Sequence, residues 1–198
     1  MLVAAALLAG AARAQAPAPA KYKGHGITFA YPGTWAKVAP GQVTQRAGTP
    51  VWEQWLQIPN TATDGQMSTD LVMLGAYRLS VSITAANIAA YDEAIRAALD
   101  SFLTQLGTTV TSPVTRTVFG KFPAYQLEID GVAPDNSPVH SRLVYAFNGR
   151  TEYALNCQHG TTSAVAPDVM LGCDQIQQSF KLVPKPKPKP KPKKKRGR

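Results

Sequence analysis

Hydrophobic residues at every second position predict several β-strands in the first half of the chain. In residues 24–38, Ile27, Phe29 and Tyr31 follow this period, and Pro32-Gly33 then breaks it. An alternation bounded by turn residues indicates a strand, a turn and the start of a second strand. The same reasoning predicts strands over 50–60 and 75–84, separated by the polar, loop-like residues 61–70.

The hydrophobic period changes to 3.6 residues after Ala85. One apolar stripe then runs along a helix that ends at Gly107, a residue type that commonly follows the last turn of a helix. The members of the stripe are Ile88, Tyr91, Ile95, Leu99, Phe102 and Leu106. We therefore expect one long amphipathic helix in the middle of the chain.

Further strands and a final helix follow. The strands are predicted over 109–120, 123–132, 139–149 and 151–158. Residues Phe147-Asn148-Gly149-Arg150 are typical of a tight hairpin, and Pro167 suits the first turn of a last helix that ends near Phe180. Successive hairpins imply an antiparallel sheet, and both helices must bury their apolar stripes against it. The sequence thus predicts an α+β fold in which helices flank an antiparallel β-sheet.

The two ends of the chain differ from this central region. Residues 1–14 combine a short apolar run with the small-residue pattern Ala12-Arg13-Ala14, which predicts a signal peptide and export rather than a transmembrane span. A linker over 15–21 would join it to a domain over 22–183. Residues 184–198 contain five Pro-Lys pairs followed by further basic residues, and this pattern predicts an extended, disordered tail.

The net positive charge is concentrated in this tail. Nine of the 21 Lys and Arg residues lie at or after Lys185, whereas all 12 acidic residues precede it. The 12 remaining basic residues balance the 12 acids, so the formal charge of residues 1–184 is zero. The nine candidate polyanion-binding residues are Lys185, Lys187, Lys189, Lys191, Lys193, Lys194, Lys195, Arg196 and Arg198.

In an exported protein, this tail would meet anionic envelope polymers or an anionic membrane surface. Its attraction to them would be sensitive to salt and independent of sequence. The tail has no aromatic residue to stack on bases, so sequence-specific nucleic-acid binding is not expected. A tail that only increases solubility and has no partner is the alternative.

The chain has two cysteines, and export would place them in an oxidising compartment. Cys157 is in phase with Tyr153 and Leu155 on the apolar side of a strand, and Cys173 lies on the apolar face of the last helix. Both sulfur atoms would point toward one core, so we expect a disulfide bond. Two buried free thiols are the alternative, and the spacing fits no metal or redox motif.

Several motifs resemble the PsbP-like family, whose bacterial members are exported proteins and lipoproteins. They are GITFAYPGTW (26–35), VFGKFPAYQLEI (118–129), YAFNGRTEYALNC (145–157) and CDQIQQSFKL (173–182), and the likeness covers about 22–183. The resemblance implies an antiparallel sheet flanked by helices, in agreement with the hydrophobic pattern. It implies little about function, because this fold serves a photosystem subunit, a nuclear Ran-binding protein and bacterial envelope proteins.

The sequence contains no recognisable catalytic motif. Its three histidines, His25, His140 and His159, do not occur at metal-ligand spacings. No nucleophile elbow, phosphate-binding loop or dinucleotide-binding glycine pattern is found either. We therefore predict a protein that is not an enzyme and that has no catalytic residues, metal or cofactor.

Polar residues alternate with apolar ones in the strands after the long helix. If these strands pair in order, one sheet face gathers Gln126, Glu128, His140, Arg142, Glu152 and Asn156. Arg142 on such a face is suited to bind a carboxylate or a phosphate. A solvated sheet face with cross-strand ion pairs explains the same pattern, and the sequence leaves both interpretations open.

Two functional hypotheses follow from these features. The first is an exported, non-enzymatic binding or accessory protein of the cell envelope, whose cationic tail associates with anionic polymers or a membrane surface. This hypothesis is compatible with an additional protein partner. The second is a soluble extracytoplasmic carrier or chaperone that acts through the polar sheet face or a pocket, with the tail incidental.

Overall fold

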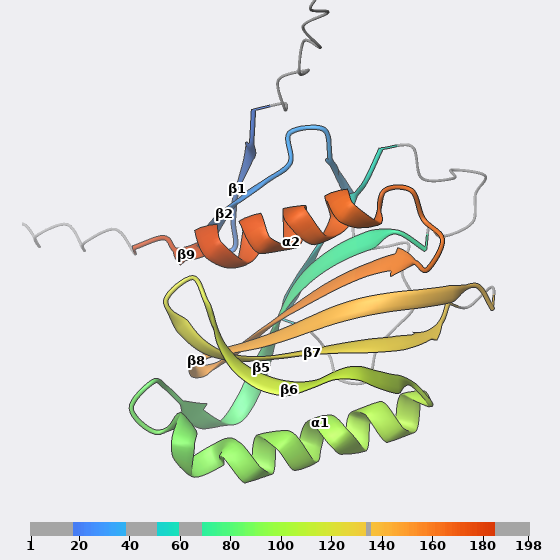
Figure 1. Cartoon of the computed structure of the whole chain (residues 1–198). Coiled ribbons are helices and arrows are strands. Elements are labelled where there is room, and N and C mark those ends of the chain that lie inside the picture. The colour runs from blue at the N-terminus through green and yellow to red at the C-terminus, as the bar shows by residue number, and fades with distance from the viewer. Residues whose placement is uncertain (1–17, 39–50, 60–68, 134–135, 185–198) are drawn as a thin grey trace, which may run out of the picture.

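A computed structural model describes residues 18–38, 51–59, 69–133 and 136–184. The predicted signal peptide and the nine cations of the tail lie outside these residues. Figure 1 shows three layers, with the helix α2 (Ala166–Ser179) on one side of a large sheet and the helix α1 (Asp92–Leu106) on the other. The predicted α+β fold, with helices flanking antiparallel strands, is confirmed.

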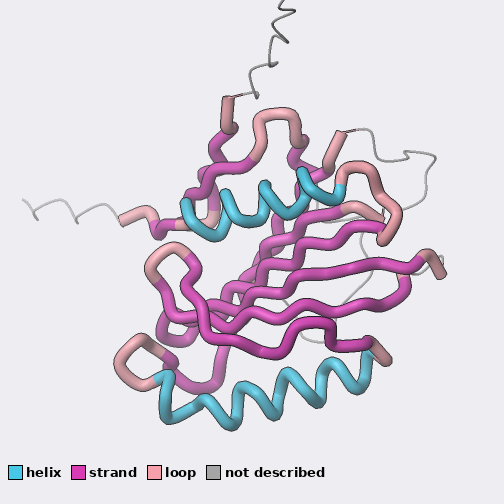
Figure 2. The backbone as a smooth tube through the Cα atoms, in the orientation of Figure 1, coloured by secondary structure: helices cyan, strands magenta, loops and turns pink. Residues whose placement is uncertain are grey.

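Within the described residues, the strands form two antiparallel sheets (Figure 2). The large sheet has the order β3-β4-β5-β8-β7-β6, and its strands are β3 (Ala36–Val38), β4 (Trp52–Gln57), β5 (Leu71–Ile83), β6 (Thr109–Phe119), β7 (Phe122–Val132) and β8 (Pro138–Gly160). The small sheet has the order β1-β2-β9, and its strands are β1 (Ala20–Gly24), β2 (Ile27–Tyr31) and β9 (Lys181–Leu182). Strand β1 begins two residues before the expected start of the domain at Tyr22.

The element β8 folds back on itself (Figure 1). Its first arm, residues 138–147, pairs with β7 over 138–146, and its second arm, residues 150–160, pairs with β5 over 151–158. The backbone N–H of Thr161 donates a hydrogen bond of 3.1 Å to the carbonyl oxygen of Pro138, so the ends of the two arms lie side by side. Gly149 at the reversal has a φ of 63°, which glycine adopts without a steric penalty. The predicted hairpin at Phe147–Arg150 is confirmed.

Each face of the large sheet has its own hydrophobic core. On the α2 side, helix and sheet bury residues that include Leu74, Val144, Leu155, Val169 and Ile176. On the α1 side, they bury residues that include Ile95, Leu99, Leu127, Leu143 and Phe147. The sheet is therefore the middle layer of a sandwich, and neither of its faces is fully solvated.

The predicted middle helix is confirmed over most of its length. A 3-10 turn, η2 (Ile88–Tyr91), leads into α1, and Gly107 ends the helix in the left-handed conformation with a φ of 63°. Leu106, the last member of the predicted stripe, is 53% exposed, and Leu103 is buried in its place. The stripe shifts because the helical period carries position 103, and not 106, back toward the sheet.

The predicted disulfide between Cys157 and Cys173 is present. It joins the second arm of β8 to α2, with a Cα–Cα distance of 6.3 Å and a sequence separation of 16. Both side chains are fully buried. This covalent link fixes α2 against the sheet.

Candidate functional site

Four of the six predicted ligand-face residues lie together on the α2 side of the sheet. Glu128 is directly opposite Arg142 in the pairing of β7 with β8, and Gln126 and His140 lie on the same face. The first arm of β8 therefore places its polar positions as the sequence predicts.

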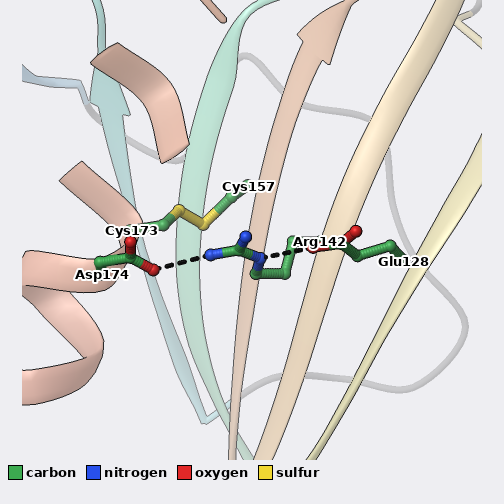
Figure 3. The surroundings of a disulfide bond; sticks show 5 residues. All are labelled: Glu128, Arg142, Cys157, Cys173 and Asp174. Atoms are coloured by element: carbon green, nitrogen blue, oxygen red, sulfur yellow. Dashed lines mark hydrogen bonds and ion pairs between the residues drawn. A yellow bond between two sulfur atoms is a disulfide. The ribbon is translucent and has the colours of Figure 1, made fainter. Parts of the chain in front are cut away.

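Arg142 in this group already has two carboxylate partners (Figure 3). Its Nε donates to Oε1 of Glu128 at 2.9 Å, and its Nη1 donates to Oδ1 of Asp174 on α2 at 2.7 Å. Asp174 is the neighbour of Cys173, so the ion pair and the disulfide act at the same turn of α2. Arg142 thus ties the helix to the sheet, and its charge is neutralised within the protein.

His140 is also held by residues of the protein. Its Nδ1 lies 2.7 Å from Oδ1 of Asp130, its Nε2 lies 3.7 Å from Oε2 of Glu128, and its ring centroid is 5.3 Å from that of His159. A polar groove of about 480 Å³ runs beside these groups, between α2 and the strands β6 to β8. Its charged lining residues, Arg142 and Asp174, pair with each other, so the groove offers little charge to a ligand.

Glu152 and Asn156 correct the prediction, because they lie on the opposite face of the sheet. Their neighbours Tyr153, Leu155 and Cys157 point into the core under α2, so the alternate positions point toward α1. The prediction assumed one apolar and one polar face. Helices cover both faces of the sheet, so both faces carry apolar residues. The hairpin in β8 also reverses the alternation: even-numbered residues face α2 in the first arm and α1 in the second.

An apolar pocket of about 360 Å³ lies on that opposite face, between α1 and the sheet. We call it the α1 pocket. Strand β5 contributes Tyr77, Leu79, Val81 and Ile83. Element β8 contributes Tyr145, Phe147, Glu152 and Ala154. The helical side consists of Tyr91, Ala94, Ile95, Ala98, Leu99 and Phe102. Ala94 and Ala98 have the smallest side chains of the helical wall, and this is why the space beside them is open.

Glu152 is the one carboxyl group among the described residues of this lining. Burial among apolar side chains raises the pKa of its carboxyl to about 7, because desolvation disfavours the charged form. Asn156 follows two residues after the lining residue Ala154 on the same face, and its Oδ1 is buried without a hydrogen-bond partner among the described residues. Glu152 and Asn156, which the sequence analysis placed on the polar face with Arg142, therefore lie on the α1 side of the sheet.

A polar cluster at the first turn of α1 fixes the helix over the sheet. The carboxylate of Asp92 accepts hydrogen bonds from Tyr125 Oη at 2.5 Å, from Arg96 Nε at 3.0 Å and from Arg116 Nε at 3.0 Å. The Tyr125 hydroxyl and the two guanidinium groups lower the pKa of the Asp92 carboxyl to about 2. Tyr125 comes from β7 and Arg116 from β6, so Asp92 anchors α1 on the half of the sheet away from β5.

Other chemistry is sparse in the described part of the chain. No group of three or more His, Cys, Asp or Glu residues there is arranged to hold a metal ion. No helix among the described residues is long and apolar enough to cross a membrane. The sequence reasoning missed the α1 pocket itself. The signal that was available is the pair Ala94 and Ala98, one turn apart beside the apolar stripe.

Comparison with solved structures identifies the fold. A cyanobacterial PsbP from Synechocystis sp. PCC 6803 matches with a TM-score of 0.53 and 13% identity, over 89% of this chain and 98% of that protein. A protein of Bacteroides thetaiotaomicron matches with a TM-score of 0.51 and 11% identity, over 85% of this chain. The chain spans about half the length, 49%, of that Bacteroides protein. LpqN of Mycobacterium tuberculosis, a protein involved in cell envelope biogenesis, is less similar, with a TM-score of 0.48 and 12% identity over 84% of this chain and 90% of LpqN.

Comparison of sequences gives no match. No protein-family model matches the chain, and no curated protein is significantly similar to it. The likeness is therefore one of structure, and it establishes a PsbP-like fold. Function has to be argued from the site.

Proposed function

We propose that this chain is an exported, non-enzymatic binding protein that holds a small apolar ligand between α1 and the large sheet. The α1 pocket is the observation that carries the proposal. Its volume of about 360 Å³ lies within the usual range of ligand sites, and hydrocarbon and aromatic groups dominate its lining. At about 30 Å³ for each non-hydrogen atom, it would hold a ligand of roughly a dozen such atoms.

Two features support the extracytoplasmic and non-enzymatic parts of the proposal. The disulfide favours an oxidising compartment, in agreement with the signal-peptide pattern of residues 1–14. The polar groups of the pocket are tyrosine hydroxyls and one carboxyl, so its described lining offers no Ser, Cys, Thr or Lys nucleophile for a base to activate.

A cavity-filling variant tests the proposal. Ala97 and Ala98 are both exposed on the same helix, but Ala98 lines the pocket and Ala97 does not. We expect n-decanol, with 11 non-hydrogen atoms by its formula (about the dozen estimated above), to bind one to one in calorimetry. Ala98→Phe should weaken this binding at least about tenfold, which is the loss expected when pocket contacts of about 1.4 kcal/mol are removed.

Ala97→Phe is the matched control, because it adds the same side chain to the same helix outside the pocket. Its affinity for decanol should equal that of the unchanged protein, and unfolding curves should show that both variants fold. Equal decanol affinity in all three proteins, or no binding to any of them, would contradict the proposal.

The basic tail supports a second, compatible proposal, that the protein associates with an anionic surface through residues 185–198. The observation is the charge division, since the nine tail cations extend from a region of zero formal charge. A chain ending at Pro184 should lose retention on vesicles containing anionic lipid at low salt, and the full chain should be released as salt rises. Equal retention of the two chains would refute this role for the tail.

A further inference from the structure

The carboxyl group of Glu152 lies in the α1 pocket and has no hydrogen-bond or ion-pair partner among the described residues. It is directly opposite Tyr77 in the pairing of β5 with β8. The Tyr77 hydroxyl instead donates a hydrogen bond of 3.0 Å to Oε1 of Glu53 on β4. Within the described residues, Glu152 forms no hydrogen bond or ion pair through its carboxyl, and burial is the one cause of its raised pKa.

Aromatic rings surround the space that this carboxyl faces. Five of the described lining residues are aromatic, namely Tyr77, Tyr91, Phe102, Tyr145 and Phe147. The face of an aromatic ring is electronegative and attracts cations. None of the described lining residues is Lys, Arg or His. The described lining therefore combines one acidic group with several electron-rich rings and contains no cationic side chain.

We infer that the ligand of the α1 pocket is an apolar amine, whose protonated nitrogen pairs with the Glu152 carboxylate while its hydrocarbon part fills the space beside Ala94 and Ala98. This inference rests on the proposed function, because it names the chemical class of ligand for the same pocket. An alcohol would satisfy one acceptor of the carboxylate and leave its charge unpaired. A carboxylate ligand would need a cation that the lining does not provide.

The raised pKa of Glu152 agrees with this assignment. Burial without a cation holds the pKa near 7, and a bound ammonium group would supply the missing opposite charge and favour ionisation. The other titratable groups of the described lining are its three tyrosines, and Glu53 lies behind Tyr77. Arg150 precedes Glu152 by two positions in β8, on the same side of the strand, but its side chain is exposed and it does not contribute to the pKa shift of Glu152. Arg96 on α1 pairs with Asp92 and bonds to the backbone of β6, away from the lining.

This arrangement predicts a pH dependence with a definite sign. Glu152 loses its proton as the pH rises from about 5 to 8, while an alkylamine, with a pKa near that of Lys at about 10.4, keeps its own. Amine affinity should therefore increase over this range. A carboxylate ligand would show the opposite trend, because the ionised carboxylate of Glu152 would repel it.

The test compares three probes of the same chain length: n-decylamine, n-decanol and n-decanoate. Calorimetric titrations at pH 8 use the full chain and Glu152→Gln, which keeps the shape and removes the charge. We expect the unchanged protein to bind decylamine about tenfold or more tightly than decanol, as a charge-assisted hydrogen bond provides. The Glu152→Gln protein should lose this preference.

The outcomes separate this inference from the proposed function. If decanol binds and Ala98→Phe blocks it, but decylamine is not preferred or Glu152→Gln keeps the preference, the pocket binds ligands and the amine assignment is wrong. Preference for decanoate would also overturn the assignment. If none of the three probes binds, the proposed function fails together with the inference. Unfolding curves of Glu152→Gln should show an intact fold, and Glu152→Asp provides a second variant with a displaced charge.

Discussion

Reduction of the disulfide between Cys157 and Cys173 should lower the free energy of unfolding by a predictable amount. The two positions are 16 residues apart. Cross-linking a loop of this length removes conformational entropy from the unfolded chain that corresponds to about 3 kcal/mol at 25 °C. Both cysteines are fully buried, so the reduced thiols can stay packed as small apolar groups, and the loss should come mainly from the unfolded state.

Urea unfolding with and without a reductant measures this loss. Domains of this kind have slopes of about 1–3 kcal/mol per molar urea, so the midpoint should fall by about 1–3 M. The double variant Cys157→Ala/Cys173→Ala is the control. It should be destabilised at least as much as the reduced protein, since it also loses packing, and its midpoint should not respond to the reductant.

The reasoning would be refuted if complete reduction, verified by thiol labelling under denaturing conditions, left the midpoint unchanged. A loss well above about 3 kcal/mol would also be informative. It would mean that the ion pair of Arg142 with Asp174, one residue after Cys173, weakens together with the disulfide. Adjacent interactions of this kind are often not additive.

Three further predictions concern single residues. Gly172→Ala should destabilise the protein by about 1–3 kcal/mol in chemical unfolding, although alanine favours helices, because its Cβ would lie 2.5 Å from Cζ2 of the buried Trp35; a more stable variant would contradict this packing. The pKa of Asp92 is about 2 in the folded state against 3.8 ordinarily, so its contribution is present above about pH 4 and is lost as the pH falls toward 2. Asp92→Asn should remove this part of the acid-unfolding profile, and an unchanged profile would exclude the Asp92 cluster as its cause. The pKa of Glu152 is raised from 4.5 to about 7, so its own contribution to stability should be greatest below about pH 4.5 and fall as the pH rises through 7. Glu152→Gln should abolish that fall, and persistence of the fall in this variant would assign it to another group.

Local patterns in the sequence predicted most of the fold. The period of two in 24–38 and the period of 3.6 from Ile88 onward identified β2 and α1, because each element must bury one side. The hairpin at Asn148-Gly149 was predictable from turn chemistry alone. The disulfide was predictable because the side of a strand and the face of a helix determine where Cys157 and Cys173 point.

The α1 pocket could not be predicted in the same way. Glu152 alternates with apolar neighbours just as Arg142 does, and the alternation does not say which helix each polar position faces. Which helix a polar residue faces depends on which residues of the two arms of β8 lie opposite each other, and on the presence of a second helix over the opposite face of the sheet. The pocket depends further on where α1 crosses the sheet, which tertiary contacts such as those of Asp92 decide.

The position of α1 explains why the pocket opens beside β5. Asp92 holds the first turn of α1 to Arg116 of β6 and Tyr125 of β7, so the helix covers that half of the sheet. A single helix is about 10–12 Å wide with its side chains, whereas neighbouring strands are about 4.8 Å apart. One helix therefore covers only two or three strands, and the apolar side chains of β5 extend beyond its edge.

Bulky residues at positions 94 and 98 would close the gap, and the chain has alanine at both. The α2 side differs, since the disulfide and Arg142 hold that helix against the sheet and the groove beside it is lined mainly by polar residues. The asymmetry of the two faces is the structural reason for placing ligand binding under α1.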